Sequence, residues 1–333
     1  MPFAPHLAGP QDPVQAEPRQ RAGSVRRTTT IDSLRPQGVT GPILVDARGR
    51  DAQLGPSGAL AIVGEQRISA TLDDTTRTIV AIDARPPVPG FEMLVGASVG
   101  PGFRARTAEL LGEAAAMGTL THALLDDWSG ASLVSGYAGQ RAGADSGSPT
   151  GPLPPTVLEA MTDICAGWAS DASIVTFVRR DGSVPTPMGP PAPLLALEDP
   201  TVWHPVAPLT AHGMRRLRRL DAWSIEVDQV GFSAHFRDSH VDALGDETVV
   251  HEYTAEGTAD RTSRIVGGIR AAARVLPWIE CPGALASVRD TVGLRLGELR
   301  RRVRNEFVGT STCTHLNDTL RSIGDVDYLL TLI

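Results

Sequence analysis

The sequence predicts an α+β protein built from two tandem copies of one domain, each an antiparallel sheet followed by helices, related by a pseudo-twofold axis. Three observations predict this architecture. Landmark residues recur at a spacing of about 190 positions, each half places strand-like segments before helix-like ones, and the composition suits a folded core. Of the 333 residues, 41% are hydrophobic and 21% are charged, so the chain can bury a substantial core and is not disordered as a whole.

The repeat is visible because its landmarks occur in the same order in both halves. The corresponding groups are Arg26-Arg27 and Asp32 with Arg215-Arg216 and Asp221, Gly49-Arg50-Asp51 with Phe236-Arg237-Asp238, Thr71, Asp73 and Arg77 with Thr258, Asp260 and Arg264, Val95-Gly96 and Gly100 with Val292-Gly293 and Gly297, and Thr121-His122 with Thr314-His315. The spacing drifts by a few positions, which indicates small insertions and deletions. No single match is specific, but the shared order is difficult to obtain by chance.

The second copy, residues 210–333, shows the order of elements most clearly. Strands are expected at 221–227, 233–241, 248–254 and 264–271, between breakers of the Gly, Asp or Asn type. Helices are expected at 283–291, 296–307 and 314–323, where Leu, Val and Ile recur at intervals of three and four residues. Strands that precede helices in this way predict an antiparallel sheet with a helical layer rather than alternating strand and helix units.

The first copy, residues 22–138, repeats this order with strands near 43–46, 68–72 and 78–84 and helices at 103–116 and 122–136. Residues 1–21, rich in Pro, Gln and Ala, are expected to form a disordered tail. Residues 139–209 are expected to form a Pro- and Gly-rich linker and insertion, with a helix at 156–168 and a hairpin around Arg180-Asp181-Gly182. The proline-rich part carrying Trp203-His204 is either an arm over a cleft or an interdomain connector packed by the tryptophan.

Charge and cysteine content exclude several classes of protein. The formal net charge of −7 argues against a general affinity for nucleic acid or an anionic membrane, and no stretch is apolar for long enough to span a bilayer. Two arginine runs, at residues 215–219 and 300–304, are expected to be solvated faces. Three cysteines are too few for a disulfide framework and the N-terminus lacks a signal-peptide pattern, so a cytoplasmic protein is expected.

The two copies differ in their polar residues, and this asymmetry is the main functional clue. Six of the eight histidines lie at or after His204. The second copy carries His235-Phe236-Arg237-Asp238-Ser239-His240 on one expected strand and His251-Glu252-Tyr253 on the next, whereas the first copy keeps Arg50-Asp51 but has no His-Glu pair. A functional site is therefore expected in the second copy.

Strand alternation predicts which of these side chains can meet. Residues 236, 238 and 240 share one face, and residues 235, 237 and 239 share the other. If Val241 pairs with Thr248, then Asp238 lies opposite His251 and Arg237 lies opposite Glu252. A partly buried carboxylate that orients an imidazole is the usual arrangement for general acid/base catalysis near neutral pH. The same residues could instead form a cross-strand ion pair worth about 0.2–1 kcal/mol, with no chemistry attached.

A second constellation is Cys313-Thr314-His315-Leu316-Asn317-Asp318, where Thr312 or Thr314 can cap the helix that follows. A thiol and an imidazole at a helix N-terminus lie in a positive field that favours a thiolate and anionic ligands. Asp318 lies one turn further on, facing His315. The group can be a nucleophile with its base, a pair of metal ligands, an anion cradle, or a polar capping turn with a buried cysteine. The first copy has Leu120 in place of Cys313.

Four of these motifs together resemble a bacterial family. They are Arg237-Asp238-Ser239, His251-Glu252-Tyr253, Leu276-Pro277-Trp278 followed by Cys281-Pro282, and Cys313-Thr314-His315-Leu316. The family they resemble is the domain of unknown function with the number two-eight-eight-nine, and the resemblance is clearest over residues 214–326. It implies a bacterial, cytoplasmic protein and the same candidate residues, but no reaction. The first copy looks like a diverged relative of this unit.

The leading prediction is an acid/base enzyme of the lyase, hydratase or hydrolase type that acts on a small organic molecule without a metal or cofactor. No Gly-rich phosphate loop, Cys-x-x-Cys pair or His-Glu-x-x-His motif is present, so neither a nucleotide cofactor nor a structural zinc is expected. A catalytic metal on His240, His251, Asp238 or His315 stays open. The alternatives are a metal-dependent hydrolase that uses the same histidines, and a non-catalytic ligand-binding or assembly subunit.

The expected catalytic residues are His251 as the base, Asp238 as its orienting carboxylate, His315 as a second acid/base, and Glu252. The expected substrate-binding residues are Arg237, as the anchor for an oxygen or carboxylate, with His240, Tyr253, Cys313, Asn317 and Asp318. The expected partner is a small molecule, with no nucleic acid or membrane, and a homo-oligomer is compatible with the sequence. The site is expected where the two copies meet, because duplicated domains commonly pack as a homodimer would.

Overall fold

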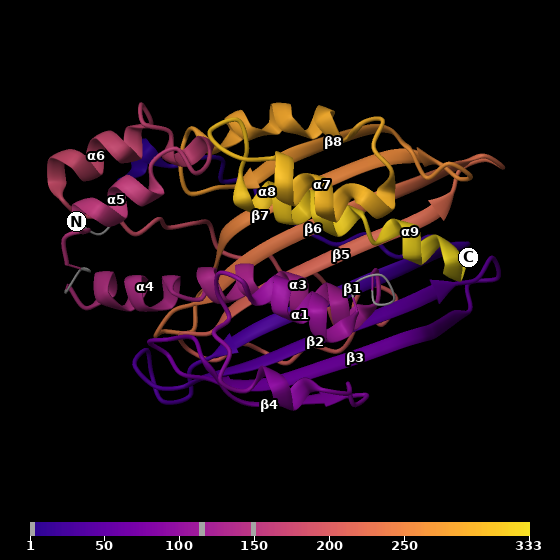
Figure 1. Ribbon diagram of the computed structural model, residues 1–333, viewed down its shortest axis with the longest axis horizontal. Helices are drawn as coiled ribbons and strands as arrows, with labels where there is room; N and C mark the ends of the chain where they lie inside the picture. Colours follow the sequence, from indigo (N-terminus) through magenta and orange to yellow (C-terminus); the bar gives the residue numbers. More distant parts are fainter. Residues whose placement is uncertain (1–3, 113–116, 148–150) are drawn as a thin grey trace.

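The computed structural model describes residues 4–112, 117–147 and 151–333. Their strands form one antiparallel sheet of eight strands in the order β4-β3-β2-β1-β5-β6-β7-β8 (Figure 1). The strands are β1 (Ser24–Leu34), β2 (Ile43–Leu54), β3 (Leu60–Leu72), β4 (Ile79–Arg85), β5 (Met214–Ser224), β6 (Gln229–Val241), β7 (Glu247–Asp260) and β8 (Val266–Val275). The predicted α+β class with an antiparallel sheet is confirmed.

The sheet consists of two meanders that join at its centre. Strands β1–β4 and β5–β8 each run back and forth in sequence order, and β1 pairs antiparallel with β5 from Ser24 opposite Trp223 to Ser33 opposite Met214. Each meander has its own hydrophobic core, with Trp128 in the first and Phe232 in the second. The two halves therefore share a sheet while keeping separate cores.

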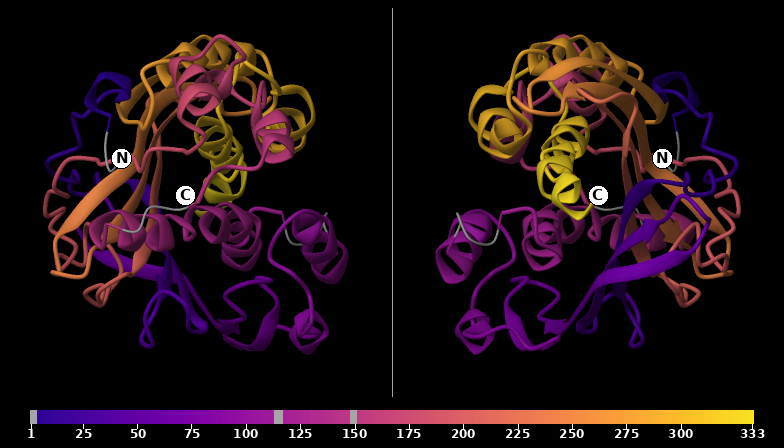
Figure 2. Two further views of the ribbon diagram at one scale, coloured as in Figure 1. Left: turned by 90° about the vertical axis from the view of Figure 1, so that its left-hand side faces the viewer. Right: turned by 90° about the vertical axis from the view of Figure 1, so that its right-hand side faces the viewer.

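Helices cover one face of this sheet, and the sheet curves around them (Figure 2). Helices α1 and α3 lie over the first meander, and α7 and α8 lie over the second (Figure 1). The helices are α1 (Phe103–Leu111), α3 (Leu120–Val134), α4 (Tyr137–Asp145), α5 (Pro155–Met161), α6 (Ser173–Asp181), α7 (Leu299–Glu306), α8 (Thr314–Ile323) and α9 (Val326–Leu329). No helix in these described ranges is long and apolar enough to cross a membrane.

Helix α8 has the bounds that its sequence pattern predicts. Leu316, Leu320 and Ile323 follow one another at intervals of four and three residues, and all three side chains are fully buried. Burying each of them contributes about 1.5–3 kcal/mol, which fixes the orientation of the helix on β6 and β7. The predicted helix at 283–291 is instead a 3-10 helix over Cys281–Thr291. Of the predicted helix at 103–116, α1 covers Phe103–Leu111, and residues 113–116 lie outside the described ranges.

The outer face of the sheet is covered by segments that the sequence analysis assigned to a tail and a linker. Glu17, in the expected disordered tail, is buried, accepts a hydrogen bond from Arg219 Nε at 2.6 Å and contacts His235. In the proline-rich segment, His204 contacts the hydroxyls of Thr28 and Thr30 at 2.8 and 3.0 Å. Composition cannot reveal these partners, because they are buried polar groups of distant strands.

The region between the two meanders is more helical than its composition suggests. Helix α4 extends into the start of the expected linker, and α6 occupies the place of the expected hairpin at Arg180-Asp181-Gly182. Ile174, Val175 and Phe177 of α6 are buried, and Gly182, with φ at 76°, ends the helix. Glycine in the left-handed region is common both at helix C-termini and in hairpin turns. The Asp-Gly pair at 181–182 therefore indicated a hairpin, although it ends a helix.

The arginine run at 215–219 is buried, which corrects the expectation of a solvated face. Strand alternation sends Arg216 and Arg218 to the helical side and Arg215 and Arg219 to the outer side, and no arginine of this run is more than 8% exposed. Both faces of β5 are covered, so a charge on this strand has no route to water and requires a carboxylate partner. Arg215, for example, is bound to Asp32 of β1 by two hydrogen bonds of 2.7 and 2.6 Å.

Candidate functional site

Asp238 and His251 face each other on the helical side of the sheet. The structure pairs Asp238 with His251 and Arg237 with Glu252, which confirms both predicted cross-strand pairs. The turn differs from the prediction, because Val241 pairs with Glu247 rather than Thr248. A register shift after Asp238 restores the predicted alignment and leaves residue 250 unpaired.

Helix α8 adds a second imidazole to this pair. Its first turn lies over β6 and β7, and the ring of His315 stacks on the ring of His251 with 3.6 Å between centroids and 19° between planes. His251 Nδ1 lies 3.3 Å from Asp238 Oδ2. The Phe236 ring also lies roughly parallel to His315, with centroids 6.2 Å apart. Asp238, His251 and His315 thus form one contiguous group.

Arg216 holds the carboxylate of this group in place. Its Nε and Nη2 donate to the two oxygens of Asp238 at 2.8 and 3.0 Å, and its Nη1 contacts Asp127 and Asp318, each at 3.0 Å. Burial alone would raise the pKa of Asp238, but the Arg216 guanidinium and the contact with His251 hold that pKa below its usual range. Asp238 is therefore ionised and held in a fixed orientation beside His251.

His315 is neutral at physiological pH. Burial lowers the pKa of His315 well below 6.5, and repulsion from His251 acts in the same direction. Two stacked imidazoles this close cannot both carry a proton without strong repulsion. The pair can therefore hold one extra proton at a time, as an acid/base catalyst requires.

Cys313 does not provide a thiolate. Its side chain is buried beside Tyr253, and its Sγ lies 4.0 Å from His315 Nδ1. Burial raises the pKa of the Cys313 thiol, so the sulfur stays protonated at neutral pH. Of the alternatives for this motif, the nucleophile is disfavoured, and a polar turn with a buried cysteine fits the geometry.

A cleft of about 570 Å³ opens beside His315. It is bounded by the segment before α1, the second half of α3, the end of α7 and the first turn of α8. Its walls combine apolar side chains, including Val99, Leu133 and Val134, with four arginines, Arg77, Arg104, Arg216 and Arg304. This volume lies in the usual range for a small-molecule site, about 300–1,000 Å³.

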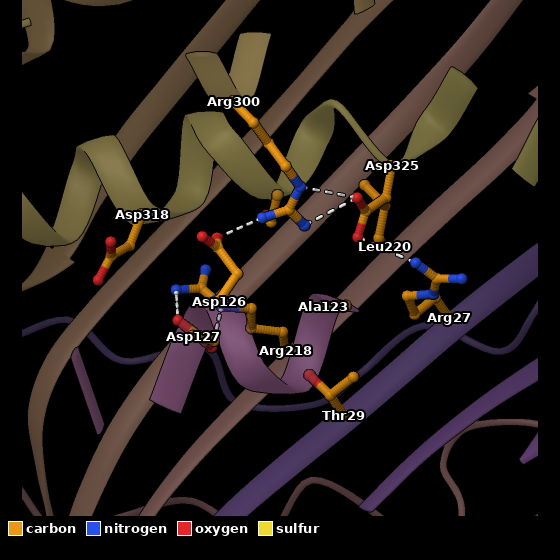
Figure 3. Close-up of a pocket in the computed structure, with 11 residues that line it drawn as sticks. Arg27, Thr29, Ala123, Asp126, Asp127, Arg218, Leu220, Arg300, Asp318 and Asp325 are labelled. Carbon is orange, nitrogen blue, oxygen red and sulfur yellow. Dashed lines mark hydrogen bonds and ion pairs between the residues drawn. The ribbon is translucent and has the colours of Figure 1, made fainter. Parts of the chain in front are cut away.

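Two other cavities suit a substrate less well. The first lies among the ion pairs that connect α3 to α7 and to Asp325, and its 20 Å³ holds about one water molecule (Figure 3). Arg300 there contacts both Asp126 and Asp325, and Arg27 contacts Asp325. The second, of about 540 Å³, lies on the outer face under the proline-rich segment, and neither His251 nor His315 lines it.

The structure does not bring Arg237 and Glu252 to the cleft. Both side chains lie on the outer side of the sheet, opposite to Asp238, as the alternation of β6 predicts. Glu252 accepts hydrogen bonds from Arg237 Nε at 2.6 Å and from the backbone of Val14 at 2.8 Å, and His235 Nε2 lies 2.7 Å away. These two residues hold the N-terminal segment and cannot reach a substrate beside His315.

Of the remaining predicted residues, Asp318 lines the cleft, whereas His240, Tyr253, Cys313 and Asn317 do not. His240 packs edge-on against Tyr137 at 5.2 Å, and burial lowers its pKa to about 4. Asn317 donates to the carbonyl of Phe307 at 2.8 Å, which positions the turn before α8. Asp318 lines the cleft and contacts Arg216 rather than His315.

Asp238, His251 and His315 also have the residue types of a metal site. One donor atom of each lies within 4.8 Å of the others. Among the described residues, this is the cluster of three His, Cys, Asp or Glu side chains that is close enough to hold a metal ion. A metal at about 2.1 Å needs two imidazole lone pairs that converge, and each lone pair lies in its ring plane. Nearly parallel stacked rings do not converge, and both oxygens of Asp238 already accept from Arg216. The geometry fits a proton relay better than a metal site.

The arginines of the site do not follow from any local sequence pattern. Arg216 belongs to a run that looked solvated, and Arg77, Arg104 and Arg304 come from three separate elements. One signal was present, because each half of the sequence carries an arginine and an aspartate at places that the predicted repeat relates. In the structure these form the matching pairs Arg27–Asp51 and Arg216–Asp238.

Comparison with known proteins gives a match to a protein-family model. No curated protein and no solved structure matches the chain. A family model matches residues 214–329, which contain Arg216, Asp238, His251 and His315 and exclude the first meander. The family model described as "Protein of unknown function (DUF2889)" matches residues 214–329, about a third of the chain, and so identifies β5–β8 with the helices that follow as the part that this family describes.

Proposed function

We propose that this chain is an enzyme that performs acid/base chemistry on a small organic molecule bound in the 570 Å³ cleft. The observation that carries the proposal is the stacked pair of His251 and His315, which lies beside the ionised Asp238 and borders the cleft through His315. The reaction is of the lyase, hydratase or hydrolase type, because these need proton transfer and no electron carrier.

Each member of the group has a distinct role. His315 is neutral, because its pKa is well below 6.5, and it presents a ring lone pair to the substrate or water in the cleft, although the same low pKa makes it a weak proton acceptor. Asp238 Oδ2 lies 3.3 Å from His251 Nδ1, so its negative charge stabilises the His251 imidazolium when that ring carries the extra proton. The proton that one imidazole removes is returned by the pair to the leaving group or product, so the catalytic cycle needs no net proton.

The two meanders are proposed to be tandem copies of one domain, related by a pseudo-twofold axis between β1 and β5. In support, Arg26 binds Asp221 across these strands and Arg215 binds Asp32, and these two pairs exchange under the proposed symmetry. The hairpin that follows β3 and the hairpin that follows β7 also have the same backbone conformation and the same side-chain hydrogen bond. Arg77 and Arg264 have φ of 56° and 61°, and the hydroxyls of Thr76 and Ser263 donate to Asp73 and Asp260, each at 2.7 Å.

Under this correspondence the first copy lacks the acid/base pair. Asp51 corresponds to Asp238, but it faces Gly64, which stands where the second copy has His251. His122 corresponds to His315, and Leu120 stands in place of Cys313. The proposal is therefore one acid/base site per chain, formed by the second copy and enclosed by helices α1 and α3 of the first.

A metal-dependent hydrolase is the second candidate, since the donor atoms of Asp238, His251 and His315 lie within 4.8 Å of one another. The test combines elemental analysis, thermal melts with and without a chelator, and a turnover screen of small organic acids, esters and amides. The acid/base proposal predicts substoichiometric metal, an unchanged melting temperature after chelation, and turnover that survives chelation. About one zinc, iron or manganese ion per chain that raises the melting temperature would instead establish the three residues as ligands.

A further inference from the structure

We propose that the cleft takes an organic anion whose carboxylate binds between Arg77 and Arg304 while its apolar part lies along α3. This inference names the substrate class of the proposed acid/base site and rests on that proposal. It follows from an imbalance of charge in the cleft and from a comparison of the two halves of the sheet.

The cleft carries positive charge that the protein itself leaves unpaired. Arg304, in the last turn of α7, is exposed and has no ion pair or hydrogen bond with any described residue. Arg77 donates to the hydroxyl of Ser135 at 2.8 Å and forms no ion pair with a carboxylate in the described parts of the chain. Each guanidinium therefore keeps donors for an anion.

The acid that borders the cleft is already shared by other arginines. Asp318 contacts Arg104 at 3.3 Å and both Arg216 and Arg321 at 3.0 Å. Its single negative charge is thus committed to three cations and does not offset Arg77 or Arg304. A neutral or cationic ligand would leave this excess charge uncompensated, whereas an anion would neutralise it.

Two helix N-termini open on the same cleft. Residues 100–102 line it and lead into α1, a helix of nine residues whose N-cap, Gly102, has no side chain to occupy the first amides. Thr314 and His315 begin α8, a helix of ten residues whose N-cap, Cys313, makes no side-chain capping hydrogen bond. The positive ends of both helix dipoles add to the field of the arginines.

In the second copy, a carboxylate of the chain itself contacts the arginine that corresponds to Arg77. Arg264 corresponds to Arg77, and its Nε lies 3.4 Å from Oδ1 of Asp327 in α9. Gly297 corresponds to Gly100, and a Cβ built on Gly297 would lie 2.9 Å from Asp327 Oδ2, so that carboxylate rests against the glycine. In the second copy, therefore, the chain supplies its own carboxylate to this cradle.

The first copy keeps the cradle but not the carboxylate. Arg77 and Gly100 both line the cleft, and the correspondence that relates His122 to His315 places Val134 where the second copy has Asp327. A Cβ built on Gly100 would meet only the Ser98 hydroxyl, at 3.6 Å, so this place is open. A ligand carboxylate can occupy it, and the neighbouring Leu133 and Val134 offer apolar contact to the rest of the ligand.

The test uses benzoate as the probe, with benzamide as its neutral isostere and inorganic phosphate as an anion without an apolar part. Binding to the full chain is measured by isothermal titration calorimetry in low-salt buffer. We expect benzoate to bind with a millimolar or lower Kd, and benzamide and phosphate each to bind about tenfold more weakly. Equal binding of benzamide, equal binding of phosphate, or no saturable binding of benzoate would overturn the proposal.

Variants locate the anion and separate this inference from the proposed catalysis. Arg77→Gln and Arg304→Gln should each weaken benzoate binding about tenfold, whereas Arg301→Gln, which removes an exposed arginine of the same run, should not change it. Val134→Asp, which copies the second half, should abolish binding without unfolding the chain. Unchanged affinity in both cleft variants would contradict the assignment. Tight benzoate binding by a protein that shows no turnover would overturn the proposed enzyme alone.

Discussion

Replacing Arg216 with methionine is expected to lower the free energy of unfolding by about 3–5 kcal/mol. The guanidinium is 2% exposed and contacts Asp238, Asp127 and Asp318, and its loss leaves the buried carboxylate of Asp238 without an arginine partner. Asp127 keeps Arg218, and Asp318 keeps Arg104 and Arg321. Methionine has a similar length and packs well, so the loss reports the charge rather than the volume. Urea unfolding at neutral pH measures it, with Arg301→Met as the exposed control.

The pH dependence of this loss provides an internal check. The pKa of Asp238 is lowered in the folded chain, so its stabilising contribution is present above the ordinary value of 3.8 and is lost as pH falls through the folded pKa. Without Arg216 that contribution is missing, and Asp238 can accept a proton in the folded variant. The difference between wild type and variant should therefore shrink as the solution is acidified. A loss below about 1 kcal/mol at neutral pH would contradict the buried network.

Replacing His251 with alanine is expected to reduce turnover by about 10²–10⁴-fold, the usual contribution of a general acid or base. The substitution removes the ring that Asp238 orients and on which His315 stacks, but Asp238 keeps both hydrogen bonds from Arg216. The melting temperature should therefore fall only by the cost of the cavity that the buried ring leaves. Measurement requires kcat and KM for any substrate that the screen provides, with kcat affected more than KM.

A matched control for His251 is His240→Phe. His240 lies on the same strand face as Asp238, is fully buried against Tyr137, and has no hydrogen-bond partner for either ring nitrogen among the described residues. The variant should keep turnover, since among the described residues His240 neither stacks on His315 nor pairs with Asp238. Equal losses in His251→Ala and His240→Phe, or a His251→Ala protein that only unfolds, would favour a structural role for His251.

The elements that the sequence predicted well are those with a clear local pattern. Helix α8 has apolar residues at helical spacing, and β6 and β7 form a hairpin whose pairs could be aligned before the structure was known. Strand β1 was missed, because its Arg26, Arg27 and Asp32 look solvated and are in fact buried on both faces. Their partners, such as Asp221, lie far along the chain, where no local pattern reveals them.

The candidate site was predictable only in part for the same reason. Asp238 and His251 follow from strand alternation, and His315 follows from its place at the start of a helix. Arg237 and Glu252 are the strand neighbours of Asp238 and His251, so strand alternation places their side chains on the opposite side of the sheet. The arginines of the cleft come from the loop before β4, from α1 and from α7, so only the packing of the two halves brings them together.

The central claim is that His251 and His315 are a proton-transfer pair without a metal, and nitrogen NMR of their imidazole rings tests it most directly. The spectra are recorded on chelator-dialysed protein as pH is lowered, and again after zinc is added. The structure predicts that the ring of His315 stays neutral as pH falls through 6.5, and that zinc leaves both rings unchanged. Protonation of His315 at or above 6.5, or a stoichiometric shift of both rings on adding zinc, would contradict it.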